Sequence, residues 1–495
     1  MEENNERKRT PPGMLARKLF GRRMILTDKE FIDATNIREV LQDSLPDHLA
    51  NRNEIEYLYR YYKGRHPIID RRKEVRPEIN NTIVENRANL VVTFRVGYTV
   101  GKPIQYVSSV ADEDVSKSIA MLNDLMRMAG KPSVDKQLVE WQMICGTGFR
   151  IVLPNEERNS KIPFVVYALD PRSTFVVYRN DYAHKPLAGV TYVTDREGNT
   201  VYTVYTDKAC YTVKGGVVEE KPYVVGRIPI IEYPLNHARL GAFEVALPLM
   251  DALDLLDSNR IDSVEQFVQS LLVCYNCQFD DDMTANAIRE AGMVVLKSIG
   301  ENKADIKVIS ETLNQTEVQT LKADLITAIN EITGTPRQDS EQRSDSSNNG
   351  AVVLRNGWQG AETRAEDFEM MFHSPEMRTL ELVSIILKGV SDASFDPYKV
   401  DVKFTRRNFE DILSKSQTLT TMLDNDKIHP QCAYEASGMF VDVQEAYNMG
   451  MEWYKAKQEE AKQQMESLPQ GEEGNTDVVK AQSAKGGEYV SGYWR

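Results

Sequence analysis

Residues Thr335 to Gly350 read TPRQDSEQRSDSSNNG, a run of sixteen positions without one large apolar side chain. Compact domains seldom contain so long a loop unless the loop performs a task or is disordered. On both sides of it, apolar residues at helical spacing predict amphipathic helices, over residues 316–333 and 351–388. A long polar loop between helices, in a chain without an evident catalytic motif, favours a moving part of an assembly over an enzyme.

The composition excludes several classes of protein. A chain of 495 residues is too long for one hydrophobic core, and its length predicts roughly three domains. Its 74 acidic and 60 basic residues give a net charge of −14, which argues against a protein that grips nucleic acid over its whole surface. That charge is compatible with a protein through which nucleic acid passes. Five cysteines favour a reducing compartment over a disulfide framework, and without a signal or a long apolar run we expect no membrane association.

The residue pattern predicts an α+β fold. From residue 146 to residue 234 the chain is rich in Val, Tyr and Thr and is divided by turn residues, which predicts an antiparallel β region. Thr27 and either Asn81 or Thr82 are candidate N-caps of the first two helices. The helices expected before the β region cover residues 27–62, 81–94, 114–128 and 134–145.

The second half of the chain predicts mainly helices. Helix returns at Ala242, a small mixed module follows over residues 272–310, and residues 408–465 contain three more helices. At Pro375 we expect a kink or a new helix, because proline lacks a backbone donor.

Two of the expected helices carry acidic stripes. On the first helix the carboxylates lie within an arc of about 80°, with apolar residues on most of the opposite side. A stripe of this kind is either a solvated face or a functional surface, and both readings stay open on periodicity alone. The residues of the first stripe are Glu244, Asp251, Asp254, Asp262 and Glu265, and those of the second, at heptad spacing, are Glu317, Asp324 and Glu331.

No arrangement of residues predicts a catalytic centre, a metal site or a cofactor. Cys274 and Cys277 form a lone CxxC without the second pair that a zinc site needs. The run from Asp280 to Asp282 fits a helix N-terminus better than a cation site. The chain has no HExxH motif and no phosphate-binding loop with its lysine.

Several segments, in order along the chain, resemble the portal (connector) proteins of tailed bacteriophages of the siphovirus type. The first segment contains a tyrosine-rich stretch with a KG turn, then paired asparagines, and it ends with the sequence GKPI before Gln105 and Tyr106. The segments are LYRYYKGRHPIIDRRKEVRPEINNTIVENRANLVVTFRVGYTVGKPIQY (58–106), GRIPIIEYPLN (226–236), ITGTP (332–336) and FTRRNFEDILSKSQTLTTMLDNDKIHPQCAYEASGMFVDVQEA (404–446).

This resemblance implies a portal-type α+β fold, with a mainly helical wing, stem and crown, an antiparallel β region in the wing and a small α/β clip. The implied parts are a flexible basic arm (1–26), a wing of helices and then strands (27–241), stem helix one (242–271), the clip (272–312), stem helix two (313–334), a tunnel loop (335–350), a long kinked helix returning to the wing (351–404), a crown (405–467) and a disordered tail (468–495).

The resemblance also implies a function without enzymatic activity. Portal proteins form a ring, a dodecamer, at one capsid vertex, through which double-stranded DNA is packaged and ejected. The implied partners are the terminase large subunit, the major capsid and scaffolding proteins, and a head-to-tail adaptor. Open alternatives are another virion structural protein, such as a collar or minor head protein, and a nucleic-acid-processing enzyme.

In a portal, an acidic lining would let DNA slide, because carboxylates repel phosphates where cations would bind them. We therefore expect one acidic stripe or the other to face the channel, with the apolar faces packed between neighbouring helices. The loop residues expected to touch DNA lightly are Gln338, Asp339, Arg343, Ser346, Ser347 and Asn348.

Overall fold

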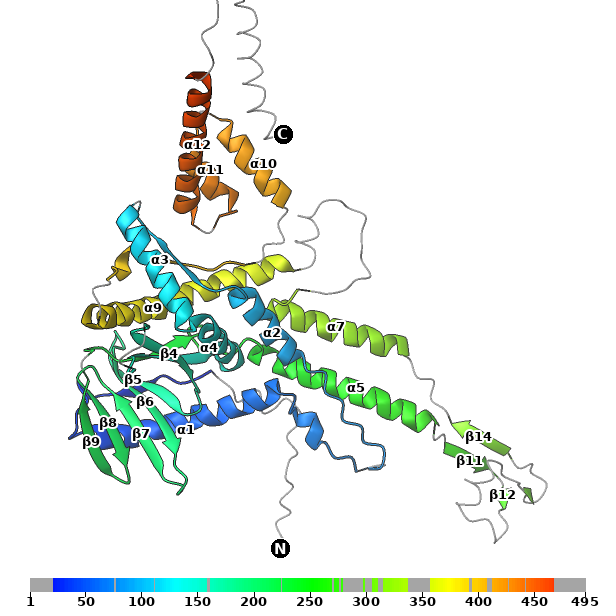
Figure 1. The fold of residues 1–495 in the computed structure, drawn as a ribbon. Coiled ribbons are helices and arrows are strands. Elements are labelled where there is room, and N and C mark those ends of the chain that lie inside the picture. The colour runs from blue at the N-terminus through cyan, green and yellow to red at the C-terminus, as the bar shows by residue number, and fades with distance from the viewer. Residues whose placement is uncertain are drawn as a thin grey trace, which may run out of the picture.

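The chain forms an α+β body, a helical hairpin that projects from the body, and a group of three helices on another side (Figure 1). In the following we call these parts the body, the hairpin and the three-helix group. The computed structural model describes residues 21–74, 77–110, 112–157, 161–223, 225–268, 271–275, 277–278, 297–298, 305–309, 315–336, 357–390, 394–406, 412–425, 427–440 and 442–466.

Four helices precede the main β region, as the periodicity predicts, but two begin later than expected. Thr27 does not cap a helix; it ends a short strand that pairs with the main sheet, and the first helix starts at Ile37. The second helix is capped by Asn86, whose side chain accepts a hydrogen bond from the Asn89 N–H. The four helices are α1 (Ile37–Tyr62), α2 (Arg87–Val100), α3 (Glu113–Met128) and α4 (Lys131–Cys145).

The β region forms two sheets. The larger has the order β1-β5-β6-β7-β8-β9 and is antiparallel except for the parallel pair of β1 and β5. The smaller has the order β10-β3-β4, and β2 pairs separately with β15. The strands are β1 (Ile25–Thr27), β2 (Gln105–Ser108), β3 (Thr147–Pro154), β4 (Phe164–Leu169), β5 (Thr174–Arg179), β6 (Pro186–Thr194), β7 (Thr200–Tyr205), β8 (Ala209–Lys214), β9 (Val217–Pro222), β10 (Ile230–Pro234) and β15 (Val400–Lys403).

Helix α1 covers one face of the larger sheet. Val40 and Leu41 of the helix belong to the same buried cluster as Val190 and Val204 of the sheet. Because side chains alternate between the two faces of a strand, every second residue of β6 and β7 can enter this cluster while its neighbours face away. Tyr192 and Tyr202 pack against the same cluster, whereas Val193 of β6 lies on the other face and is 66% exposed.

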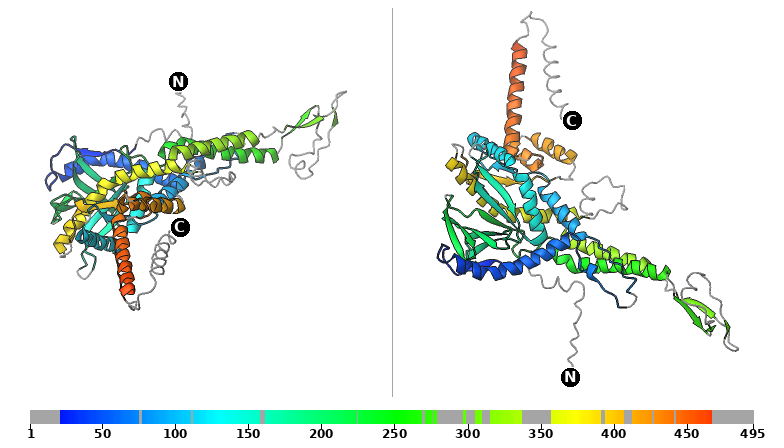
Figure 2. Two further views of the ribbon diagram at one scale, coloured as in Figure 1. Left: turned by 90° about the horizontal axis from the view of Figure 1, so that it is seen from above. Right: turned by 60° about the horizontal axis from the view of Figure 1, so that its bottom comes forward.

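The long helix α9 (Trp358–Val390) crosses the body (Figure 2). The expected interruption at Pro375 is absent, since this proline lies inside one continuous helix. Buried Phe372 precedes it and buried Leu380 follows it, so packing on both sides holds the helix together despite the missing hydrogen bond.

A buried ion cluster fixes α9 to the body immediately after Pro375. Glu376 accepts hydrogen bonds from Arg150 of β3 at 2.6 Å and from the Tyr106 hydroxyl of β2 at 2.5 Å. Lys131 of α4 lies 3.0 Å from the same carboxylate, and both cations also contact Asp135. All of these side chains are buried, so each charge depends on its partners in place of water.

The cluster holds Glu376 in its ionised form. Burial alone would raise the pKa of this carboxyl, but Arg150 and Lys131 outweigh that effect and lower it to about 2. Burial and the neighbouring Glu376 raise the pKa of the Tyr106 hydroxyl well above its ordinary value. The tyrosine therefore acts as a hydrogen-bond donor to the carboxylate.

We predict that Glu376→Gln lowers the free energy of unfolding by about 3 to 5 kcal/mol, because it leaves buried cations short of a partner charge. Urea unfolding followed by circular dichroism measures this. Glu366→Gln, at an exposed position of the same helix, is the matched control and should change little.

The same variant should also alter the pH dependence of stability. Because the folded pKa of Glu376 lies below its ordinary 4.5, its contribution is complete above pH 4.5 and is lost as the pH falls towards 2. Glu376→Gln should therefore flatten the stability curve in that window. Equal stability of the variant and the wild-type chain would contradict the role assigned to the cluster.

Candidate functional site

The hairpin has two helices, as the sequence predicts. A 3-10 turn, η3 (Glu244–Ala246), leads into α5 (Leu247–Val268), and α7 (Gln315–Thr333) runs back to the body. Between them the chain forms strands β11 (Leu271–Tyr275), β12 (Cys277–Gln278), β13 (Lys297–Ser298) and β14 (Asp305–Ile309), which lie at the far end of the hairpin (Figure 1).

The acidic stripe of α5 is buried within its own subunit, which corrects the expectation that it faces a channel. Asp254 is fully buried, and Asp262 is 2% and Asp251 4% exposed. Glu244, in η3, is 5% exposed and pairs with buried Arg22 at 2.7 Å. Only Glu265 is partly exposed. The first four carboxylates therefore hold this chain together and do not line a lumen.

The segment between α1 and α2 covers this stripe and bonds to it at regular intervals. The backbone N–H groups of Asn81, Ile83 and Glu85 donate in turn to Asp262, Ser258 and Asp254, at 2.8, 2.9 and 2.8 Å. The three acceptors, each four residues from the next on α5, receive every second N–H of the segment. We call this contact the amide ladder.

The regularity of the amide ladder follows from the geometry of the two backbones. Two residues of extended chain advance about 6.6 Å, and four residues of helix advance about 6 Å. An extended segment running antiparallel to a helix can therefore place alternate N–H groups over every fourth side chain. Asn81 lies in this extended segment, well before α2 begins at Arg87, and the cap of α2 is Asn86 instead.

At the end of the amide ladder nearer the body, a tyrosine and a histidine side chain bond to the carboxylates of α5. The Tyr61 hydroxyl donates to Asp251 at 2.9 Å, and His66 Nδ1 lies 2.5 Å from Asp254. The Tyr61 and His66 rings stack at 3.7 Å. Burial, followed by the neighbouring Asp254, raises the pKa of Asp251 to about 6.

Two basic residues of the same segment neutralise the outer end of the ladder. Lys73 and Arg71 lie 2.5 and 3.3 Å from Asp262. Burial would raise the pKa of Asp262, but Lys73 and the Asn81 bonds lower it. The basic run in this segment thus has a structural partner in the same subunit.

The acidic stripe of α7 lies in a different environment. Glu317, Asp324 and Glu331 are exposed. Another side of the same helix faces α5, where Lys322 contacts Asp257 and Glu85, each at 2.9 Å. Of the two predicted stripes, the one on α7 is therefore the exposed one.

The polar loop leaves the body at a firmly held helix end. Arg95 of α2 and Arg364 of α9 donate to the carbonyl oxygens of Thr333 and Ile332, at 2.9 and 2.6 Å. Gly334 has a φ of +66°, the left-handed conformation that commonly ends a helix. The six loop residues expected to touch DNA lie outside the described residues: Gln338, Asp339, Arg343, Ser346, Ser347 and Asn348.

Within the described ranges, no cluster of three or more His, Cys, Asp or Glu side chains has the geometry of a metal site. None of the described helices combines the length and apolar character needed to cross a bilayer. The described residues thus form an α+β body with a projecting hairpin, and the carboxylates of α5 are bonded within the subunit.

Comparison with known families identifies the class of protein. The model of the family described as phage portal protein, SPP1 Gp6-like, matches residues 41–467. The chain belongs to this family of phage portal proteins, which are structural components of the virion and form rings.

Solved structures provide a weaker likeness, and no curated protein matches the chain. One similar chain comes from a structure titled "Neck of empty GTA particle computed with C6 symmetry", with 12% identity and a TM-score of 0.43. The match covers 71% of this chain and 90% of that chain.

The amide ladder was missed by sequence reasoning, although one signal for it exists. The α5 stripe places Asp254, Ser258 and Asp262 four residues apart, with a serine among the acids. Ser258 has a short side chain between two aspartates. Its hydroxyl can accept a bond only from a backbone that lies close to the helix, and a longer side chain at this position would keep that backbone at a greater distance.

We predict that Asp262→Ala detaches the outer end of the amide ladder. Hydrogen bonds to charged groups contribute about 1.5 to 3 kcal/mol, so the Asn81 amide should exchange roughly ten times faster or more. Hydrogen exchange read by mass spectrometry over residues 79–86 measures this. Asp324→Ala, an exposed carboxylate of α7, is the control; equal protection in both variants would show that the ladder contributes nothing.

Proposed function

We propose that this protein forms the ring-shaped channel at one capsid vertex through which double-stranded DNA enters and leaves the phage head. The observation that carries the proposal is the exposed carboxylate row on α7, at heptad spacing on a projecting hairpin of a portal-family subunit. In a dodecameric ring, Glu317, Asp324 and Glu331 would give the channel three acidic levels.

The sign of this charge suits transport of DNA better than binding. Each phosphate neutralised by a cation releases counterions and adds affinity, which would slow a moving duplex. Carboxylates repel the phosphates and leave the DNA free to slide. A basic row at the same positions would have the opposite effect.

Each part of the fold can be assigned to one part of a portal ring. We assign the body to the wing, α5 and α7 to the stem, the strands at their far end to the clip, and α10 (Ile412–Leu423), α11 (Pro430–Ser437) and α12 (Val443–Glu466) to the crown. The loop after Gly334 would be the tunnel loop, which touches DNA lightly.

The partners proposed for this ring follow from the same assignment. The terminase large subunit would dock during packaging and supply the ATP hydrolysis, and a head-to-tail adaptor would replace it. The wing would meet the major capsid and scaffolding proteins. The clip, at the outer end of the stem, is the part best placed for the terminase and the adaptor.

Cryo-electron microscopy of the purified chain tests the ring directly. We expect class averages with a central channel and rotational symmetry close to twelvefold, with α7 at the channel wall. A monodisperse monomer or dimer across salt and protein concentration would contradict the proposal, and rings with α7 turned away from the lumen would contradict the acidic lining.

We predict that replacing Glu317, Asp324 and Glu331 with lysine makes the ring bind double-stranded DNA. The affinity should fall steeply with salt, because each new phosphate contact releases counterions. Fluorescence anisotropy of a labelled duplex over a salt series measures this, and DNA packaging by the variant should stall.

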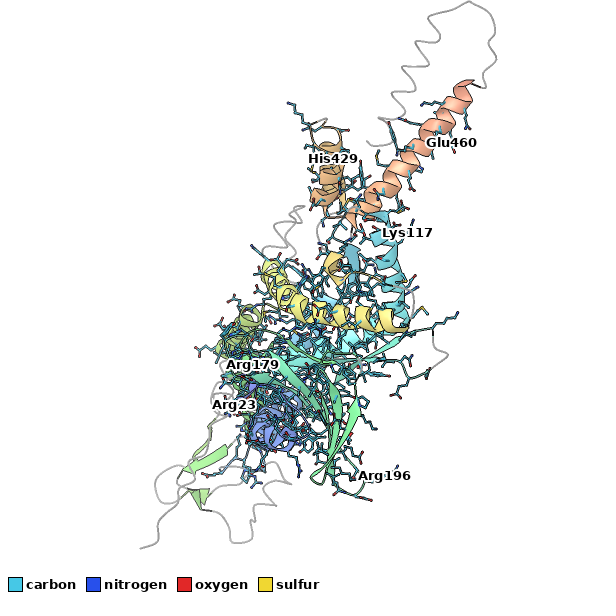
Figure 3. The ribbon with its side chains drawn as sticks, turned by 90° about the vertical axis from the view of Figure 1, so that its left-hand side faces the viewer. Arg23, Lys117, Arg179, Arg196, His429 and Glu460 are labelled. Atoms are coloured by element: carbon cyan, nitrogen blue, oxygen red, sulfur yellow. The ribbon has the colours of Figure 1, made fainter. Side chains whose placement is uncertain are left out.

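The matched control places the same change of charge at the rim of the larger sheet. Glu197, next to Arg196 on the turn between β6 and β7 (Figure 3), and Glu219 and Glu220 of β9 are exposed. Lysine at these three positions should affect DNA binding and packaging much less. Equal effects of the two triple variants would indicate general attraction and not a lining.

A further inference from the structure

The outer half of α12 has no cover in its own subunit. The helix extends past α11 and away from the body (Figure 2), and residues 452–463 are all exposed. Met449 and Trp453 are each 63% exposed, which is high for side chains of this size. A helix segment without tertiary packing is marginal in water, so this half of α12 needs a partner.

The side chains of this segment fall on two opposite sides of the helix. At about 100° per residue, positions two apart differ by about 160° around the axis. Met449, Trp453 and Glu460 therefore share one side, within an arc of about 40°, while Met451, Lys455 and Lys462 share the opposite side. We call these side A and side B.

The two sides complement each other chemically. Side A presents the Trp453 ring and the Glu460 carboxylate, and side B presents the ammonium groups of Lys455 and Lys462, each two residues further along the helix. Lys457 of the same helix already lies over one face of the Trp453 ring, at 4.7 Å from its centroid, so a lysine of the neighbour would take the other face. Lysine is attracted to the face of a tryptophan as well as to a carboxylate. No ion pair or hydrogen bond of the Glu460, Lys455 or Lys462 side chains occurs within the described part of the subunit, and Figure 3 shows Glu460 and His429 on separate helices.

We propose that α12 packs side by side with the α12 of a second copy of this chain, side A of one against side B of the next. Such a contact is heterologous, and repeated around an axis it closes a ring. Glu460 would pair with Lys462 of the neighbour and Trp453 with Lys455, each across an axial offset of about 3 Å that long side chains can span. The proposal rests on the proposed ring and identifies a contact within it.

A second copy fits this surface better than a different protein. Two sides that match each other but lie opposite on one helix cannot meet within a subunit, whereas parallel helices around an axis bring them together at every interface. The acidic column of Glu452 and Glu459, which lies on neither side, remains free to face solvent.

Zero-length cross-linking of wild-type rings with a carbodiimide tests the contact. This reagent joins a carboxylate to an amine in direct contact by an amide bond, with loss of one water. We expect mass spectrometry to find Glu460 joined to Lys462 or Lys455. Within one helix these groups point to opposite sides, so such a link has to connect two copies.

Two variants distinguish a specific contact from random reaction. Glu460→Gln should abolish the link, while Glu459→Gln should leave it at the wild-type level. Glu460→Lys should lower the melting temperature of the ring, and the double variant with Lys462→Glu should restore much of the loss. Rings that lack a link from Glu460 to Lys462 or Lys455 overturn the contact alone; a chain that stays monomeric overturns the ring and the contact together.

Discussion

The position of the long helix α9 depends on one buried pair, Arg150 and Glu376. Because neither charge can return to water without unfolding, the pair admits few arrangements of the elements that carry it. Lys131, Tyr106 and Tyr233 extend the constraint to α4, β2 and β10. The sheet, the N-terminal helices and α9 are thereby held in one mutual arrangement.

That arrangement is transmitted to the hairpin along α9. Near the start of α9, Arg364 donates to the last turn of α7, and Arg95 of α2 binds the next carbonyl oxygen. Burial, followed by the repulsion of Arg364, lowers the pKa of Arg95 to about 10. Two cations are thus brought close together at a helix C-terminus, where the helix dipole and the free carbonyl groups offset their repulsion. The base of the polar loop is therefore rigid.

The sequence predicted the elements of this fold better than their partners. The hairpin helices and the extent of the antiparallel β region were expected close to where they occur, since apolar periodicity reports directly on burial. Thr27 failed as a helix cap because a distant strand, β5, binds it. Pro375 failed to interrupt α9 because packing on both sides outweighs one lost hydrogen bond. In both cases long-range contacts, which local patterns do not contain, decided the outcome.

The acidic stripes of α5 and α7 also depend on long-range contacts that local sequence patterns do not contain. The two stripes look alike in the sequence, but they lie in different surroundings in the fold. Periodicity assigned carboxylates to one face of α5 and one face of α7, but it could not say what lies against each face. On α5 the face binds the chain's own backbone through Asp254 and Asp262, which anchors the helix to the body. On α7 the carboxylates are exposed. In the channel proposed above, the carboxylates of α7 would repel DNA while those of α5 attach their helix to the body, so the two tasks would fall on different helices.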